Sequence, residues 1–224
     1  MSWPGIEISS SIRPRCKRCR AMIDKPCAEY AARNSSPILE VLEREFASAR
    51  KVLEIGSGTG QHAVTFGARL PHLSWQTSDL EENHGAIRAW IDGAGLANVH
   101  YPLAIDVRAA QVDADCWDGV FSANTAHIMS IEAVRAMFSL VGRALRRNGV
   151  FCLYGPFRQG GKFNTTSNAE FNVSLRARDP DMGIRDIEVL DEFGRGTGLR
   201  RTRLYAMPAN NHLVVWARSG SDAS

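Results

Sequence analysis

The chain has 224 residues, a length that suits one compact α/β domain. Hydrophobic residues make up 44% and charged residues 23%, which are ordinary values for a globular protein and argue against extensive disorder. The net charge of +3 is too small to indicate a nucleic-acid partner by itself. No apolar run approaches the roughly 18 residues that a membrane-spanning helix needs, so we expect no membrane association.

The beginning of the chain differs in composition from the rest. Residues 13–20 are basic and poor in apolar side chains, and we interpret residues 1–29 as a mobile arm, 30–218 as the domain and 219–224 as a tail. Cys16 and Cys19 form one CxxC pair, but no second pair follows at zinc-finger spacing, so we predict no metal site. The odd count of five cysteines and the lack of a signal layout predict a reducing, cytoplasmic location. Organelle targeting by the arm stays open.

Apolar periodicity predicts the first elements of the domain. Ser36 is a predicted N-cap and Pro37 a first helical position. The helix that follows carries an apolar stripe of Ile38, Leu39, Leu42 and Phe46. Strands are then predicted over residues 51–55, 73–77, 99–105, 117–122 and 150–154, and helices over 61–69, 82–94 and 131–146. Gly95 is a predicted helix stop, and Asn148-Gly149 a turn before the last of these strands.

The alternation of strands and helices predicts a mostly parallel sheet that is covered on both faces. A long polar loop, 155–168, and a short helix follow it, and residues 184–193 resemble another helix. Two strands are predicted over 199–207 and 213–217, as an antiparallel pair at the edge of the sheet. The predicted fold class is therefore α/β, a Rossmann-like, seven-stranded sheet, mostly parallel, with an antiparallel C-terminal strand pair.

The most informative segment is a hydrophobic strand that enters a turn with three alternate glycines, Gly56, Gly58 and Gly60, before a helix. Glycines allow a tight turn and the close approach of a ligand to the backbone, and ligands of open α/β sheets lie beyond the carboxyl ends of strands. Dinucleotide sites use the spacing GxGxxG, whereas this chain has GxGxG. The spacing favours S-adenosylmethionine (SAM), which has no phosphate, over NAD.

Three acidic residues stand at the ends of three successive predicted strands. Glu54 can meet the cationic head of SAM directly or through water, Asp79 can accept hydrogen bonds from the ribose hydroxyls, and Asp106 can accept one from the adenine amino group. Either aspartate alone is equally consistent with an ordinary loop start. The three acids in register with the glycine turn make the cofactor interpretation more specific.

At this point the chain resembles class I SAM-dependent methyltransferases. More narrowly, it resembles a poorly characterised SAM-dependent methyltransferase-like group that includes the animal methyltransferase-like protein twenty-six. The resemblance covers about residues 30–218, in the segments ARN (32–34), PIL (37–39), LEIGSGTGQH (53–62), WQTSD (75–79), ANTAHI (123–128), YGPF (154–157), SN (167–168), GIRD (183–186) and MPANN (207–211). It implies the fold and the cofactor but no acceptor, because most of the group has no assigned substrate.

These patterns give candidate residues for each part of the site. The predicted cofactor-binding residues are Glu54, Gly56, Ser57, Gly58, Gly60, Gln61, Asp79, Asp106 and Asn124. The predicted acceptor-binding residues, polar or aromatic groups beside element ends, are Arg33, Asn34, His62, Phe157, Asn168, Arg185, Asn210 and Asn211. Any one of the polar groups among them is equally suited to cap a helix or a turn.

Methyl transfer from a sulfonium is an in-line displacement, in which the enzyme mainly aligns the reactants and excludes water. His127 is the best candidate base, with Asn124 and Tyr154 as further catalytic candidates at the ends of the fourth and fifth strands. His127 can instead be a structural histidine that caps the following helix or that bonds to the backbone. After the fourth strand the chain lacks the Asn/Asp-Pro-Pro-aromatic motif of enzymes that methylate base amines, which argues against DNA or RNA amino groups.

The leading interpretation is a SAM-dependent methyltransferase that acts on a small molecule. A SAM-binding interaction protein with little catalysis is the first alternative, because the cofactor residues fit both. A protein or RNA methyltransferase recruited by the basic arm is the second. The acceptor, the methylated atom and the oligomeric state are left open by the sequence.

Overall fold

The computed structural model describes residues 29–220, so Cys16, Cys19 and the rest of the predicted arm lie outside the described residues. The elements of the amino-terminal half are α2 (Glu29–Glu45), β1 (Lys51–Glu54), α3 (Gln61–Arg69), β2 (Ser74–Asp79), the 3₁₀ helix η1 (Glu81–Asn83), α4 (His84–Ala94) and β3 (Val99–Ala104). Those of the other half are β4 (Trp117–Ala123), α5 (Ile131–Ala144), β5 (Leu145–Gly155), β6 (Phe157–Arg158), α6 (Thr166–Arg178), β7 (Arg185–Asp186), α7 (Ile187–Arg195), β8 (Leu199–Met207) and β9 (Asn211–Arg218).

The seven-stranded sheet has the order β3-β2-β1-β4-β5-β9-β8. The first five strands are parallel, whereas β9 is antiparallel to both β5 and β8. The α/β fold class with an antiparallel C-terminal pair is thus confirmed. Because β9 runs against β5, its first residues lie beside the carboxyl end of β5, where Gly155 is opposite His212. A separate parallel pair, β6 and β7, follows at this edge.

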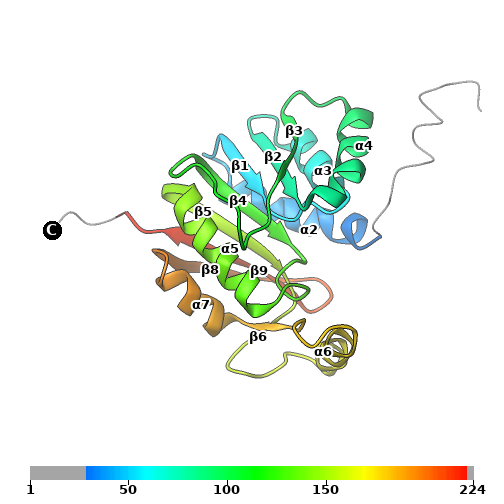
Figure 1. Ribbon diagram of the computed structural model, residues 1–224, viewed down its shortest axis with the longest axis vertical. Coiled ribbons are helices and arrows are strands. Elements are labelled where there is room, and N and C mark those ends of the chain that lie inside the picture. Colours follow the sequence, from blue (N-terminus) through cyan, green and yellow to red (C-terminus); the bar gives the residue numbers. More distant parts are fainter. Residues whose placement is uncertain (1–28, 221–224) are drawn as a thin grey trace, which may run out of the picture.

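Helices cover both faces of the sheet (Figure 1). One core joins α2, α3 and α4 to the sheet through side chains such as Leu42, Phe66 and Ile87, and the other joins α5 and α7 through Phe138 and Leu190. Successive strand residues alternate between the two cores, as a pleated sheet buried on both faces requires. None of the helices within residues 29–220 is long and apolar enough to span a membrane.

The predicted start of the first helix is wrong. Helix α2 begins at Glu29, and Pro37 lies inside it rather than at its first position. Within a helix, proline lacks the N–H that would bond four residues back, and its ring crowds the carbonyl there. In the same stretch the Ser35 hydroxyl bonds the carbonyl of Ala31 at 2.5 Å. Burial of the predicted apolar stripe, including Ile38 and Phe46 at 0% exposure, outweighs the cost of a proline inside the helix.

Other predicted boundaries also differ from the structure, including that of the helix predicted over 131–146, which ends at Ala144. Asn148-Gly149 does not precede the fifth strand but interrupts it, since β5 begins at Leu145 and its register with β4 shifts here. Residues 82–94 are divided between η1 and α4, although the predicted stop at Gly95 is confirmed by its left-handed backbone. The predicted helix from Ile184 starts later, because β7 pairs with β6 and Asp186 then caps α7.

Candidate functional site

The glycine turn connects β1 to α3 with the backbone conformations that its sequence predicts. Gly56 and Gly58 have φ angles of +71° and +59°, which side chains other than glycine rarely adopt. A Cβ on Gly56 would lie 2.6 Å from the Thr125 side chain, so the turn packs closely against the loop after β4. A Cβ on Gly58 would meet nothing within 4 Å. The turn is therefore open at Gly58, on the side where a ligand can approach the backbone.

Glu54 lies beneath this turn with only 2% of its surface exposed. Its Oε2 accepts hydrogen bonds from the Ser57 hydroxyl at 2.9 Å and from the Trp75 indole N–H at 3.1 Å. Burial raises the pKa of Glu54 from 4.5 to about 7, and the charge of Asp79 adds to this, while the two hydrogen bonds oppose it. A cation near this carboxylate would favour its ionised form.

Asp79 ends β2 and ties the glycine turn to the next loop. Its Oδ2 accepts the Gly58 N–H at 2.7 Å, and its Oδ1 accepts the Leu80 N–H and the Asn83 amide, each at 2.8 Å. The structure thus brings Glu54, Gly58 and Asp79 together, as the sequence predicts. Asn83 was not predicted, although it stands four residues after Asp79 at the end of a short polar stretch.

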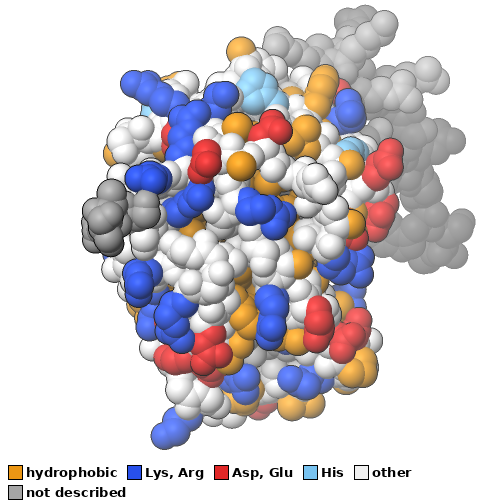
Figure 2. All heavy atoms as spheres, turned by 60° about the vertical axis from the view of Figure 1, so that its left-hand side comes forward, with side chains coloured by type: hydrophobic (Ala, Val, Ile, Leu, Met, Phe, Trp, Pro, Cys, Tyr) orange, Lys and Arg blue, Asp and Glu red, His pale blue; other side chains and the backbone are white. Residues whose placement is uncertain are grey.

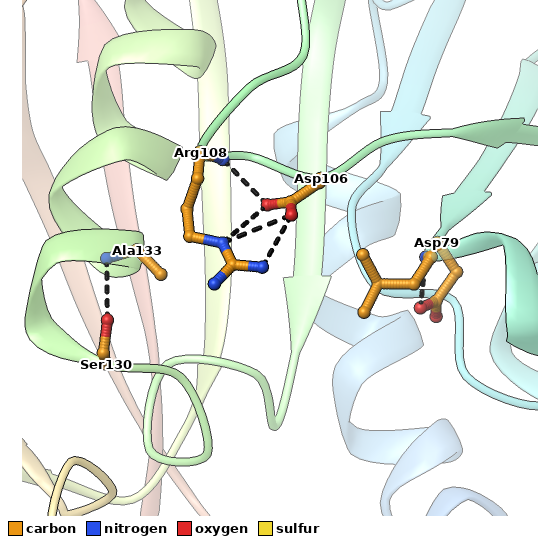
Figure 3. Close-up of polar contacts among 6 residues, drawn as sticks. Asp79, Asp106, Arg108, Ser130 and Ala133 are labelled. Atoms are coloured by element: carbon orange, nitrogen blue, oxygen red, sulfur yellow. Dashed lines mark hydrogen bonds and ion pairs between the residues drawn. The ribbon is translucent and has the colours of Figure 1, made fainter.

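Asp106 follows β3 and is more exposed than the other two acids. Arg108 binds its carboxylate through the guanidinium, with a contact of 2.7 Å, and through the backbone N–H at 3.0 Å. These bonds lower the pKa of Asp106 to about 2. Figure 3 shows the Arg108 side chain folded back onto Asp106, with Asp79 apart from both. Asp106 is therefore charged but already paired.

His62, the second residue of α3, joins a polar network that includes three predicted acceptor-site residues and the catalytic candidate Tyr154. The His62 Nε2 lies 2.7 Å from the Asn34 Oδ1, Asn34 bonds the Tyr154 hydroxyl, and the Asn211 amide donates to that hydroxyl at 3.0 Å. Burial lowers the pKa of His62 to about 4, so the ring is neutral at neutral pH. The network connects α2, α3, β5 and β9 at the carboxyl edge of the sheet.

Gln61, the first residue of α3, is also buried, and its side-chain oxygen accepts the Thr59 hydroxyl at 3.0 Å. This bond closes the far end of the glycine turn. Ser57 and Gly60 are held to each other within the turn by a backbone hydrogen bond of 2.9 Å. The predicted cofactor residues from Glu54 to Gln61 therefore form one ordered unit.

The loop after β4 carries Asn124 and His127. Asn124 has a φ angle of +58°, a left-handed conformation that asparagine tolerates better than most residues, and its N–H bonds the Tyr154 carbonyl at 2.9 Å. The loop ends at Ser130, whose hydroxyl accepts the Ala133 N–H and caps α5 (Figure 3). Ser130 therefore caps α5, and the alternative that His127 caps this helix is wrong.

His127 is 7% exposed and faces the end of β5. A Cβ on Gly155 would lie 3.6 Å from the His127 Nδ1. The ring of Phe171, in α6, packs edge-on against the imidazole of His127, with 5.6 Å between the ring centroids. Burial and the charge of Arg185 lower the pKa of His127 to about 4. No hydrogen bond within residues 29–220 engages its imidazole, which is therefore neutral and able to accept one.

Arg185, a predicted acceptor contact, is placed differently. It is 8% exposed, and its guanidinium donates to the carbonyls of Ala126 at 2.9 Å, of Asp181 at 2.7 Å and of Met129. These bonds hold the loop that carries His127. Burial lowers the pKa of Arg185, an effect to which neighbouring arginines contribute.

The remaining predicted acceptor residues are dispersed. Phe157 is 1% exposed and belongs to the core beneath α5, whereas Arg33 is exposed on α2. Asn168 and Asn210 lie together, since the Asn168 amide donates to the Asn210 carbonyl at 3.1 Å and anchors α6 to the β8–β9 turn. In the structure these two residues bond to neighbouring chain segments.

Sequence reasoning missed several side chains at this edge. Ile128 and Phe171 are 47% and 41% exposed, and Phe171 contacts His127. Arg158 and His212 directly follow residues that were predicted, Phe157 and Asn211. Adjacency to predicted residues was the only signal for these two. It does not identify site residues, because in an extended strand the next side chain points to the opposite face.

Two surface cavities lie away from the glycine turn. One, of about 380 Å³, is at the amino ends of β4 and β5 and is lined by Arg44, Arg147 and the ion pairs Arg146–Asp118 and Arg203–Glu45. Figure 2, in which the left-hand side of Figure 1 is turned forward, shows Lys and Arg interspersed with acidic side chains. The other, of about 390 Å³, lies between α4 and β3. Neither contains a predicted site residue.

Over residues 25–218 the chain matches the family described as "Protein of unknown function (DUF938)". It belongs to this family. The DUF938 chain is also similar in structure to an O-methyltransferase family protein from Burkholderia thailandensis, with a TM-score of 0.74 and 18% identity. That match covers 87% of this chain and 59% of the other, so the chain spans less than two thirds of the relative's length.

Two further structures support the same fold for the DUF938 chain. PigF, solved with SAH, has a TM-score of 0.72 and 16% identity, and the match covers 84% of this chain and 57% of PigF. An O-methyltransferase family 2 protein from Planctomyces limnophilus DSM 3776, in complex with apigenin, has a TM-score of 0.75 and 13% identity over 92% of this chain and 62% of that one. At these identities the similarity establishes a methyltransferase fold.

Proposed function

We propose that the chain is a SAM-dependent methyltransferase whose acceptor is a small molecule. The observation that carries this proposal is the glycine turn, open at Gly58 and flanked by the carboxylates of Glu54 and Asp79. It stands at the carboxyl edge of a methyltransferase sheet, and PigF, which shares this fold, was solved with SAH. The narrower resemblance to the methyltransferase-like twenty-six group, the domain limits 30–218 and a cytoplasmic location belong to the same proposal.

The residues of the turn fit such a cofactor. The open side of Gly58 and the backbone of Gly56, Ser57 and Gly60 form its cradle, and Gln61 closes it. Glu54, whose pKa is raised by burial, would be stabilised as a carboxylate by the cationic head. Asp79 would accept from the ribose hydroxyls and Asp106 from the adenine amino group. When bound, SAM supplies an electrophilic methyl group on its sulfonium.

The acceptor would lie over the ends of β4 and β5. Asn124 and Tyr154 are joined there through a backbone hydrogen bond, and His127 presents a neutral imidazole beside Gly155. His127 would accept the proton or hydrogen bond of an acceptor hydroxyl. The exposed side chains of Ile128 and Phe171 would shield the reacting atoms from water.

The network of Asn34, His62, Tyr154 and Asn211 would form the opposite wall and fix the acceptor's orientation. Arg185, Asn168 and Asn210 would act by holding loops, with Phe157 packed beneath them and Arg33 at the rim. The related O-methyltransferase in complex with apigenin supports a small organic acceptor.

Calorimetry with SAM, SAH and NAD tests the cofactor, and labelled SAM with a fractionated cell extract tests the transfer. We expect binding of SAM and SAH without comparable binding of NAD, and label in a low-molecular-mass fraction. Tight binding of NAD alone would contradict the proposal. SAM binding with label only in protein or RNA would favour a macromolecular acceptor, and SAM binding without any transfer would favour the interaction protein.

A further inference from the structure

Glu54 is a buried acidic residue without a cationic partner among the described residues. It is 2% exposed and takes part in none of their ion pairs. A carboxylate that is taken out of water is destabilising unless hydrogen bonds or an opposite charge compensate. Two neutral donors, the Ser57 hydroxyl at 2.9 Å and the Trp75 indole N–H at 3.1 Å, bond the same oxygen, Oε2. The carboxylate is therefore held in place, but its charge is not balanced.

The other oxygen of Glu54, Oε1, is left free by these two bonds. No group among the described residues donates a hydrogen bond to it. It is also not one of the fully buried side-chain atoms that lack a partner in the described part of the chain. The glycine turn above it is open at Gly58, where an added Cβ would meet nothing within 4 Å. Oε1 is therefore the oxygen that stays available to a cation with N–H donors.

Trp75, the donor on β2, is fixed by the core around it. It is fully buried and is opposite Val52 in the sheet. Glu54 is two residues further along β1, so its side chain lies on the same face as those of Val52 and Trp75. The rings of Phe66 and Phe121 pack against the indole with centroid distances of 5.7 and 5.9 Å. Since such packing leaves a side chain little freedom, the indole N–H donates to Glu54 from a rigid position.

The charged groups near Glu54 do not stabilise its carboxylate. Asp79, on β2, disfavours a second negative charge beside it. The glycine turn and the neighbouring end of β4, from Phe121 to Ala123, carry no charged side chain. His62, at the start of α3, is neutral because burial lowers its pKa to about 4. In the free protein the ionised form is therefore favoured by the two hydrogen bonds to Oε2.

A second buried tryptophan shows what distinguishes this bond. Trp216, on β9, donates its indole N–H to Asp191 at 2.8 Å, but Asp191 is also paired with Arg201 at 3.1 Å. A buried indole N–H generally needs a partner, and there it bonds a carboxylate whose charge is already balanced. Trp75 donates to a carboxylate without such a cation, so the same type of bond leaves a charge for a ligand to balance.

We propose that Trp75 is a positioning residue for the cofactor: its indole N–H holds Oε2 of Glu54 and leaves Oε1 to accept from the cationic amino group of SAM or SAH. Trp75 does not touch the cofactor and acts through Glu54. This inference rests on the proposed function, because it requires that Glu54 bind the cofactor. Loss of the indole N–H then weakens cofactor binding by changing the orientation and the protonation of one carboxyl group.

Trp75→Phe in the full-length protein removes the N–H and keeps an aromatic ring in the core. At neutral pH its affinity for SAH, measured by calorimetry, should fall by about tenfold or more, the size of one hydrogen bond to a charged group. The pH below which affinity declines should rise by about one unit, because one bond fewer favours the carboxylate. Trp216→Phe, the matched control, loses the same type of bond in the other core and should keep the affinity and pH profile of the wild type.

A double variant separates this role from a general loss of packing. If Trp75 acts through Glu54, Trp75→Phe should change SAH affinity little in a Glu54→Gln background. Circular dichroism shows whether each variant is folded. An equal loss of affinity in both backgrounds, or a loss that is the same at every pH, would overturn the inference. So would a folded Trp75→Phe protein that binds SAH as tightly as the wild type does.

NMR of the wild type tests the same contact without a variant of Trp75 that has to fold. The ¹³C signal of the Glu54 carboxyl should titrate with a midpoint near pH 7 in the free protein, and the indole N–H signal of Trp75 should follow it. SAH should shift both signals. A Trp75 signal that does not respond to the Glu54 titration overturns the inference. Wild-type protein that binds neither SAM nor SAH would contradict the proposed function and this inference with it, whereas SAH binding without a response of Trp75 removes this inference alone.

Discussion

The two halves of the carboxyl edge differ in how their polar groups are satisfied. Around β1 and β2, the carboxylates of Glu54 and Asp79 accept N–H and O–H groups from the glycine turn and its neighbours. Around β5, β6 and β9, the Arg158 Nε and the His212 Nδ1 are buried without a hydrogen-bond partner among residues 29–220. The first half is preorganised by hydrogen bonds among its own residues, whereas the second keeps buried polar atoms that no described residue satisfies. The expected effects of mutation differ accordingly.

The largest effect is expected from His127→Gln, which changes only the acceptor half. The rate of methyl transfer to a hydroxyl acceptor should fall by about 10²–10⁴-fold, the usual share of a general base, while SAM affinity stays unchanged. The lowered pKa of about 4 keeps the imidazole neutral, so the wild-type rate should hold between pH 8 and pH 5 and fall only as pH approaches 4. A rate loss that merely follows unfolding, measured by melting temperature, would make His127 structural.

Glu54→Gln changes only the cofactor half. Above pH 7 it should weaken SAM binding by roughly 10–100-fold, because a charged hydrogen-bond partner of the cationic head is lost. In the wild type, affinity should fall as pH drops below about 7, since the carboxylate must give up its proton to bind a cation. Calorimetry across pH checks this, and a pH-independent affinity in the wild type would place Glu54 outside the cofactor contacts.

Although Glu54→Gln should weaken SAM binding, it should stabilise the folded protein at neutral pH. Because the folded-state pKa of Glu54 is raised from 4.5 to about 7, the folded protein binds this proton more tightly than the unfolded chain does. Stability from this group is therefore lost as pH rises from 4.5 to 7, by up to about 3 kcal/mol. Denaturant titrations should show this loss in the wild type and not in Glu54→Gln; identical pH profiles would mean that Glu54 titrates normally.

A smaller effect is expected from Tyr154→Phe, at the boundary between the halves. The change removes the hydroxyl that Asn34 and Asn211 share, and should lower the free energy of unfolding by about 1–3 kcal/mol. Leu204→Val, a half-buried position on the edge strand β8, is a control for a general packing loss. If Tyr154→Phe costs no more than the control, the network contributes little to the wall between the halves.

The smallest effect is expected from Arg108→Ala. It releases the exposed carboxylate of Asp106, which the adenine amino group is proposed to use. SAM affinity should rise severalfold at most, and less at high salt, because exposed ion pairs are weak and screened. A lower affinity in this variant would instead show that Arg108 itself contacts the cofactor.

The difference between the halves also explains what the sequence could predict. The cofactor half depends on neighbours along the chain, so the strand, the glycines, the start of α3 at Gln61 and the acid at Asp79 could be predicted from short-range patterns. The mostly parallel sheet follows from the same alternation of strands and helices, whereas the order of its strands comes from the structure alone.

The acceptor half depends on residues far apart in the chain. Arg185 bonds to Ala126, and Asn211 to Tyr154, and no local pattern fixes such pairs. Pro37 was expected at a helix start because local propensity favours it there, but burial of the helix against the sheet was stronger. Only the folded chain shows that the Arg158 Nε and the His212 Nδ1 are buried without partners among the described residues.

The central claim is that the glycine-turn half alone binds the cofactor, and amide mapping by ¹⁵N NMR tests it most directly. SAH is titrated into labelled protein and each backbone amide is followed. The account predicts the largest shifts at Gly56, Gly58 and Gly60, with smaller shifts after β2 and β3, and little change at Arg147 and Gly149 on the opposite edge. Shifts centred on the cavity at the amino ends of β4 and β5, with the turn unaffected, would contradict it.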